Sequence, residues 1–281
     1  MTATAEPTPI AAAPAAGTEG AARILHRLGD RTARPPELTI PEMLHHSVEH
    51  YTHKAALLYK KDDEWLTITY GELNRQVERL ALGFIDLGVE AGARVALLSE
   101  NRPEWAIVDL ALTSIGSVNV PLYTTLPPPQ VEYIVEDAGA QVLIVSNGKQ
   151  LAKALEVRER LPELKHVVVM DPPAELPEGV LPLDDLYARA DKRPGGEEFD
   201  RRRAAVRASD PATIIYTSGT TGAPKGAMLT HDNFMSNAQS AAPLFEVRED
   251  DLFLSFLPLS HVFERLAGHY FPLLVGASIA Y

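Results

Sequence analysis

The sequence contains no cysteine, which excludes disulfide bonds, metal sites built on thiolates and a cysteine nucleophile. Basic side chains are also scarce. The chain has 26 lysines and arginines against 38 aspartates and glutamates, which gives a formal net charge of −12. Such an acidic surface argues against a nucleic-acid partner, because phosphate backbones require a basic face.

Long apolar runs are missing as well. The most apolar stretch, residues 105–122, is interrupted by Asp109, so no transmembrane helix is predicted. The N-terminal residues are rich in alanine, proline and threonine, with no basic residue before Arg23. They lack the charged start and bulky apolar centre of a signal peptide. We expect residues 1–38 to form a disordered leader and the protein to be cytoplasmic.

With 281 residues, 46% of them hydrophobic, the chain can bury a sizeable core. Residues 39–281 are expected to fold as one unit, in which short apolar strands alternate with amphipathic helices. In the segment after Pro103, for example, Trp105, Val108 and Leu112 share one side of a helix. This alternation predicts an α/β fold with mostly parallel sheets layered with helices.

A proline-rich stretch at about residues 171–210 interrupts the alternation. It is expected to be a surface connection with a short helix near residues 183–190. Its basic triplet, residues 201–203, follows two glutamates and is interpreted as a solvated face rather than a binding patch.

The stretch Tyr216-Thr-Ser-Gly-Thr-Thr-Gly-Ala-Pro-Lys-Gly226 lies between two β-rich runs and suits a loop. Glycines let backbone N–H groups approach an anion, hydroxyls add donors and can ligate a hard cation, and Lys225 supplies a charge. The loop therefore predicts a site for a magnesium polyphosphate. It is not a Walker loop, which ends in Gly-Lys-Ser/Thr, and no G-x-G-x-x-G pattern indicates a dinucleotide site.

These eleven residues resemble the signature loop of the AMP-forming acyl-adenylate ligases, which include acyl-CoA synthetases, luciferases and peptide-synthetase adenylation domains. Further stretches resemble the long-chain fatty acid–CoA ligase branch of that family. They are Trp65-x-x-Ile-Thr-Tyr-Gly-Glu-Leu73, Asn101-Arg-Pro-Glu-Trp105, Val120-Pro-Leu-Tyr123 and Leu257-Pro-Leu-Ser-His-Val-Phe-Glu-Arg265. The resemblance spans about residues 40–281.

By this resemblance the chain is the N-terminal AMP-binding part of an enzyme that activates a long-chain fatty acid with ATP and Mg²⁺ and passes the acyl group to coenzyme A. Thr217 matches the threonine that ligates Mg²⁺. The β- and γ-phosphates would be held by Lys225 and the preceding loop, Ser218, Gly219, Thr220, Thr221 and Gly222. His261 matches the position that lines the acyl and adenylate pocket.

The sequence departs from the family in one respect. It contains no Tyr-Gly-x-Thr-Glu segment, whose glutamate completes the family's Mg²⁺ site, and no C-terminal domain with its lysine. We therefore expect a fragment or a natural short form with impaired or absent adenylation. Two other functions stay open: a different acyl-adenylate-forming ligase, and a non-catalytic nucleotide-binding fragment. The resemblance also leaves open a homodimer and a peripheral membrane contact.

Two groups of charged residues are set aside. His45, His46, His50 and His53 have the spacing of a metal cluster, but a polar helix side without a carboxylate is the preferred interpretation. Glu264 and Arg265 fit an ion pair on a helix surface and are left out of the predicted site.

Overall fold

The computed structural model describes residues 35–192, 196–217 and 223–281. In these ranges the strands form two sheets. The larger has seven strands in the order β7-β6-β5-β3-β4-β8-β9, and the smaller has four in the order β10-β11-β1-β2. All neighbours are parallel except the pairs β8–β9 and β1–β2. The predicted α/β fold with mostly parallel sheets is therefore confirmed.

The seven-stranded sheet is built from short apolar strands. Its six parallel members are β7 (Val180–Pro182), β6 (His166–Val169), β5 (Val142–Val145), β3 (Arg94–Leu98), β4 (Val118–Leu122) and β8 (Pro211–Thr217), and β9 (Lys225–Thr230) is the antiparallel edge. Strands β4 and β5 are buried at every residue. This is the pattern of a parallel sheet that is covered on both faces.

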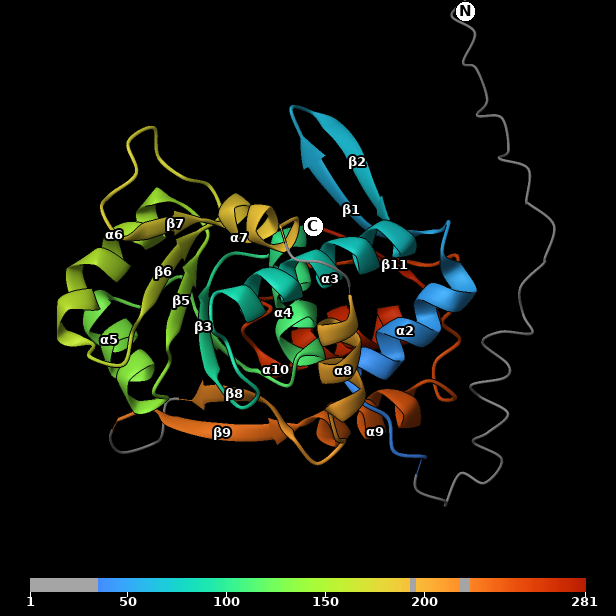
Figure 1. Ribbon diagram of the computed structural model, residues 1–281. Helices are drawn as coiled ribbons and strands as arrows, with labels where there is room; N and C mark the ends of the chain where they lie inside the picture. The colour runs from blue at the N-terminus through green and yellow to red at the C-terminus, as the bar shows by residue number, and fades with distance from the viewer. Residues whose placement is uncertain (1–34, 193–195, 218–222) are drawn as a thin grey trace, which may run out of the picture.

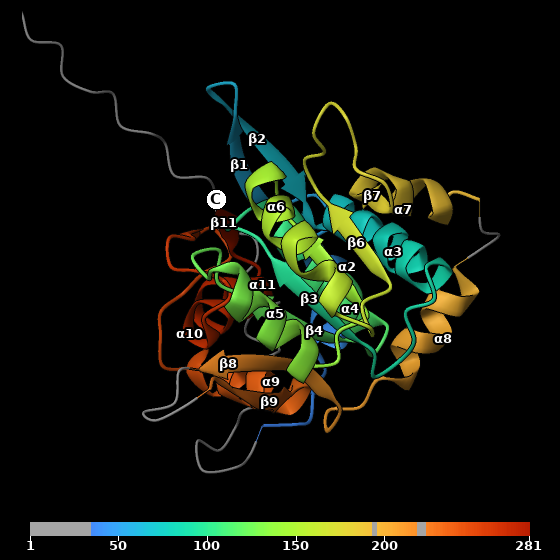
Figure 2. The same ribbon diagram turned by 90° about the vertical axis from the view of Figure 1, so that its left-hand side faces the viewer.

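One face of this sheet is covered by two helices, α5 (Pro128–Asp137) and α6 (Gly148–Val157), followed by a 3₁₀ turn (Arg158–Arg160). They pack on the side chains that β3, β4, β5 and β6 direct to that face. Figure 2, which views the molecule from this side, shows α5 and α6 in front of the strands. Asn147 caps α6 by accepting hydrogen bonds from the N–H groups of Lys149 and Gln150.

The other face is covered by a helical layer that separates the two sheets (Figure 1). Its main helices are α2 (Ile40–Tyr51), α3 (Tyr70–Asp86), α4 (Pro103–Ser114) and α9 (His231–Ala241). Capping boxes at Thr39 and Thr69 begin α2 and α3, as their Thr-x-x-Glu sequences predict. Every residue of α4 except Glu104 is buried, because this helix lies between the two sheets.

The smaller sheet consists of β1 (Ala55–Lys61), β2 (Glu64–Thr69), β10 (Leu252–Leu254) and β11 (Ser278–Ala280). The turn between β1 and β2 places Asp62 and Asp63 at positive φ, as a tight hairpin requires. Between β10 and β11 the chain forms α10 (Val262–Glu264), a π-helical segment (Arg265–Tyr270) and α11 (Phe271–Val275).

The proline-rich stretch is more regular than the sequence indicates. The expected short helix is present as α7 (Leu183–Ala190), but β7 joins the sheet before it and α8 (Glu197–Ala205) follows it. The basic triplet lies on α8, where Arg201 and Arg202 both pair with Glu198. The predicted leader, residues 1–38, lies outside the described residues up to position 34.

Candidate functional site

The candidate site lies at the carboxyl-terminal edge of the seven-stranded sheet. Parallel strands end together there, and α/β proteins commonly bind ligands outside these ends. Thr217 is the last residue of β8, and Asn101 and Asn147 follow β3 and β5 along the same edge. The side chain of Glu100 connects two of these strand ends, since it accepts hydrogen bonds from Ser146 and Gln150.

Two of the predicted phosphate-binding residues face each other across a hairpin. Strands β8 and β9 are antiparallel, and their register pairs Thr217 with Lys225. Both residues are exposed. The residues between them lie outside the described residues: Ser218, Gly219, Thr220, Thr221 and Gly222. The structure therefore describes only the two ends of the predicted loop.

Helix α5 holds both ends of this loop. The hydroxyl of Tyr216 donates a hydrogen bond of 2.5 Å to Asp137, and the hydroxyl of Tyr133 donates one of 3.0 Å to the carbonyl of Pro224. Burial, and then the Asp137 carboxylate, raise the pKa of Tyr216 well above its usual value. Tyr216 is therefore a neutral donor at physiological pH, and the strand beside the loop is fixed to the helix.

A close approach between the strands also explains one glycine of the signature. A Cβ added to Gly226 would lie 2.6 Å from Cγ2 of Ile214 and 3.1 Å from Cζ of Tyr216. No ordinary side chain fits at these distances. Gly226 thus lets β9 approach β8 where the hairpin leaves the loop.

Lys225 has no acidic partner among residues 35–192, 196–217 and 223–281. Some of the other basic side chains in the described residues are paired: Arg102 contacts Asp171 and Arg160 contacts Glu132. An exposed cation without a partner, opposite a threonine hydroxyl, fits a polyphosphate with its magnesium ion, because both groups bind through charge and oxygen.

The third predicted residue, His261, lies in the segment between β10 and α10. Its side chain is exposed, and its Nδ1 accepts a hydrogen bond of 3.1 Å from the N–H of Phe263. The neutral ring therefore carries its proton on Nε2. No hydrogen bond or ion pair joins His261 to Thr217 or Lys225 in the described residues, so its membership of the site remains a prediction.

The interpretation of Glu264 and Arg265 as a surface ion pair is wrong. Arg265 is fully buried and pairs with Asp109 of α4, not with its neighbour. Its guanidinium also donates 2.6 Å to Oγ1 of Thr213 and 3.1 Å to the hydroxyl of Tyr270. Glu264 is buried too and accepts a hydrogen bond from Ser255. Consecutive residues do not point the same way on a helix, so the two side chains have separate partners.

The buried residues Asp109, Arg265, His269 and Tyr270 form a cluster, and its charge balance depends on Asp109. Burial alone would raise the pKa of Asp109, but the charge of Arg265, the nearby ring of His269 and a hydrogen bond from Asn119 hold it well below its usual range. Burial lowers the pKa of His269, which is neutral at pH 7. The cluster therefore contains one carboxylate and one guanidinium, neither exposed to solvent.

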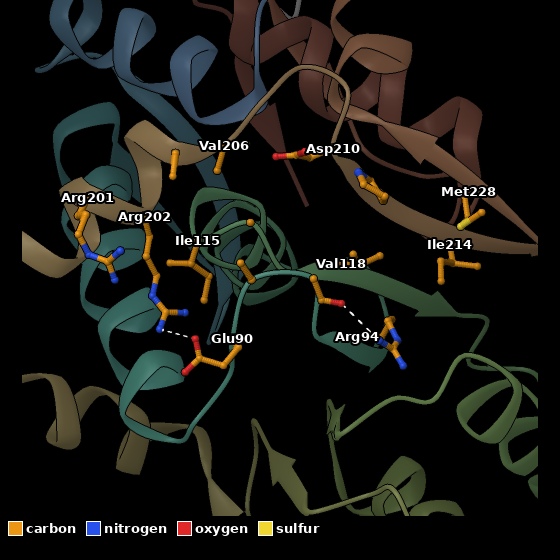
Figure 3. Close-up of a pocket in the computed structure, with 15 residues that line it drawn as sticks. Glu90, Arg94, Ile115, Val118, Arg201, Arg202, Val206, Asp210, Ile214 and Met228 are labelled. Atoms are coloured by element: carbon orange, nitrogen blue, oxygen red, sulfur yellow. Dashed lines mark hydrogen bonds and ion pairs between the residues drawn. The ribbon is translucent and has the colours of Figure 1, made fainter.

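A cavity of about 460 Å³ lies at the opposite edge of the sheet (Figure 3). Arg94 and Val118, the first residues of β3 and β4, line it together with Arg202 and Met228. Arg202 is paired there with Glu90 at 2.9 Å. None of the site residues predicted from the sequence lines this cavity, although Arg201 and Arg202 of the basic triplet do, and the cavity is not part of the candidate site.

The histidines of α2 are arranged differently from the expectation. His46 and His50 gather with Glu49, so that one potential ligand atom of each lies within 4.8 Å of the others. The assumption that no carboxylate is present is therefore wrong. His45 lies 3.4 Å from the same carboxylate, which gives Glu49 a partner without a metal ion.

Sequence comparisons identify related proteins. The profile of the family described as AMP-binding enzyme matches residues 44–281. The long-chain-fatty-acid–CoA ligase FadD15 of Mycobacterium tuberculosis is 37% identical over 206 residues, which are 73% of this chain and 33% of that protein. The long-chain-fatty-acid–CoA ligase heimdall of Drosophila melanogaster is 33% identical over 256 residues, 88% of this chain and 37% of that protein. This chain thus spans about a third of the length of these relatives.

Solved structures agree with the sequence comparison. The anthranilate CoA ligase AuaEII, solved in complex with anthranoyl-AMP, superposes with a TM-score of 0.75 and 26% identity, over 89% of this chain and 46% of that one. Since the family profile matches most of the chain and the fold agrees, this protein belongs to the AMP-binding enzyme family.

Proposed function

We propose that this chain carries the nucleotide-binding part of a long-chain fatty acid–CoA ligase. The observation that carries the proposal is the pairing of Thr217 with Lys225 at the carboxyl edge of the sheet, at the two ends of a Gly/Ser/Thr loop. The long-chain assignment rests on the motif at residues 257–265 and on the printed names of the curated relatives.

The reaction has two steps. A carboxylate oxygen of the acid attacks the α-phosphorus of ATP, the bond to the β-phosphate oxygen breaks, and pyrophosphate leaves. The thiol of coenzyme A then attacks the acyl carbon and displaces AMP. Neither step requires a nucleophile from the protein. Catalysis of this kind depends on positioning the reactants and on stabilising charge on the phosphate oxygens.

The residues on the chain supply these functions as follows. Lys225 binds the β- and γ-phosphates together with the loop from Ser218 to Gly222. The hydroxyl of Thr217 would ligate Mg²⁺, which neutralises phosphate charge when bound. His261, with its proton on Nε2, lines the pocket for the acyl group and the adenylate.

The described helices do not include one whose length and apolarity would let it cross a bilayer. A peripheral membrane contact and a homodimer remain part of the proposal by family resemblance alone.

Binding of MgATP tests the phosphate site. Replacing Lys225 by alanine is expected to weaken MgATP binding at least tenfold, or about 1.4 kcal/mol, in isothermal titration of this chain. The matched control is Lys165→Ala, an exposed lysine beside the amino end of β6, which should leave the affinity unchanged. Equal affinities for wild type and Lys225→Ala would refute the assignment of the loop.

Pyrophosphate release with different acids tests the substrate class. Release that depends on palmitate and not on benzoate is the expected result. Release with benzoate alone would indicate another acyl-adenylate-forming ligase. MgATP binding without any acid-dependent release would indicate a non-catalytic nucleotide-binding piece.

A further inference from the structure

Trp105 and Asp109 are spaced by four along α4 and therefore lie on one side of this helix, and Asn101 lies in the turn two residues before the helix begins. The proposed function gives none of them a role. All three contact the segment from residue 255 to residue 270, which contains His261. Helix α4 and the turn before it thus contact the chain on both sides of His261, a candidate site residue.

Asn101 anchors the segment before His261. Its Nδ2 donates to the carbonyl of Leu257 at 2.6 Å and to Oγ of Ser255 at 2.9 Å, and its Oδ1 accepts from the N–H of Leu259 at 2.9 Å. One amide therefore satisfies backbone groups on both sides of Pro258. These residues are more than 150 positions apart in sequence, so the contact is tertiary and not a local turn.

Asp109 anchors the segment after His261. It pairs with Arg265 and accepts a hydrogen bond of 2.6 Å from the hydroxyl of Tyr270. Trp105 packs beside Arg265, whose guanidinium carbon lies 5.7 Å from the centroid of the tryptophan ring. The imidazole of His269 meets the same ring edge-on at 5.9 Å. All of these side chains are buried.

The same cluster reaches the phosphate strand. Arg265 donates to Oγ1 of Thr213, which in turn donates 2.6 Å to the carbonyl of Asn119 on β4. Thr213 belongs to β8, the strand that ends at Thr217. The segment of His261 and the strand of the phosphate loop are therefore tied to one buried arginine.

His261 lies between the residues that contact Asn101 and those that contact Asp109, and it makes hydrogen bonds with nearby backbone groups. Its N–H donates to the carbonyl of Pro258 and its carbonyl accepts from the N–H of Arg265. Within the described residues its ring bonds to the backbone of Phe263 alone. The place of the ring at the sheet edge is thus set by what holds the two flanks.

We propose that Asn101, Asp109 and Arg265 are positioning residues. They fix His261 relative to Thr217, so that the part of the site that binds the acyl-adenylate and the part that binds the phosphates are held in one arrangement. This inference rests on the proposed function. It assigns Asn101 a role in binding the acyl-adenylate through His261, without contact with the nucleotide phosphates.

Asn101 is the residue to vary, because it is only partly buried and its loss leaves the charge cluster intact. Asn101→Ala removes all three hydrogen bonds, whereas Asn101→Asp keeps the acceptor for Leu259. The matched control is Asn147→Ala, which removes the cap of α6 at the same sheet edge and does not touch the His261 segment.

Two measurements are made on this chain. Amide hydrogen exchange across residues 257–264 is expected to be at least tenfold faster in Asn101→Ala, less so in Asn101→Asp, and unchanged in Asn147→Ala. Affinity for hexadecanoyl sulfamoyl adenosine, a stable analogue of the acyl-adenylate, should fall at least tenfold in Asn101→Ala while MgATP affinity stays within twofold.

The outcomes separate the inference from the proposed function. Unchanged exchange in Asn101→Ala, or an equal loss for the analogue and MgATP, would overturn the inference, because a general loss of stability weakens both ligands. If wild type binds neither ligand, the proposed function fails, and the exchange data alone decide whether Asn101 positions the His261 segment.

Discussion

Replacing Arg265 by methionine tests the buried cluster most directly. The variant leaves the carboxylate of Asp109 in the core with two neutral donors, the hydroxyl of Tyr270 and the amide of Asn119. Breaking a buried ion pair by removing one partner typically lowers the free energy of unfolding by about 3–5 kcal/mol. Because the two donors remain, we expect about 3 kcal/mol, a large share of the roughly 5–15 kcal/mol of a typical domain.

The assay is equilibrium unfolding in urea followed by tryptophan fluorescence. Of the two tryptophans, Trp65 is 57% exposed and Trp105 is fully buried beside Arg265, so Trp105 reports on the cluster. The matched control is Arg160→Met, which breaks an exposed pair with Glu132 and should change stability by less than about 1 kcal/mol.

The pH dependence identifies the cause. In the wild type the pKa of Asp109 is depressed, so its ionised form stabilises the fold above the unfolded pKa of about 3.9, and this contribution is lost as pH falls. In the variant, the buried Asp109 lacks Arg265, which raises its pKa. The loss in free energy of unfolding relative to the wild type should therefore be largest at neutral pH and become smaller towards about pH 4. A destabilisation no larger than that of Arg160→Met, or one independent of pH, would refute the reasoning.

Two further changes have defined outcomes. Burial lowers the pKa of His231 to about 4, and its Nδ1 accepts from the N–H of Ile40, so the wild type should lose stability as pH falls from about 6.5 to about 4. His231→Gln should remove up to about 3 kcal/mol of that loss. A plot of the free energy of unfolding against pH should therefore be flatter for the variant, and a slope equal to that of the wild type would contradict this prediction. Gly226→Ala should destabilise by about 1–3 kcal/mol and weaken MgATP binding, because its Cβ would meet Ile214 at 2.6 Å. The control Gly148→Ala has nothing within 4 Å and should be neutral or stabilising in thermal unfolding.

The periodic part of the fold was predictable because it depends on local patterns. Thr-x-x-Glu sequences indicate the starts of α2 and α3, and short apolar runs indicate most of the strands. The phosphate loop was recognisable for a similar reason, since its glycines and hydroxyls are contiguous. Strand β7 was missed because it has three residues and ends in Pro182, and proline signals a break more often than a strand.

The supports of the site could not be predicted in the same way. Asn101 and Asp109 are polar residues whose partners in the segment around His261 lie more than 150 positions away, and no periodicity encodes such contacts. One signal was available but not used. The helix after Pro103 has apolar residues on all sides, which indicates a helix buried all round, and an aspartate within it must have a buried partner.

The order of the strands in the smaller sheet has a consequence for synthesis on the ribosome. Strand β1 pairs with β11 through Leu57 and Ile279, so its partner is translated more than 200 residues later. At roughly 5–20 residues per second, the β1–β2 hairpin waits about 10–40 s with one edge unpaired. All strands of the seven-stranded sheet are therefore synthesised before β11 is available to the smaller sheet, and the β1–β2 hairpin gains its second neighbour only after that sheet is complete.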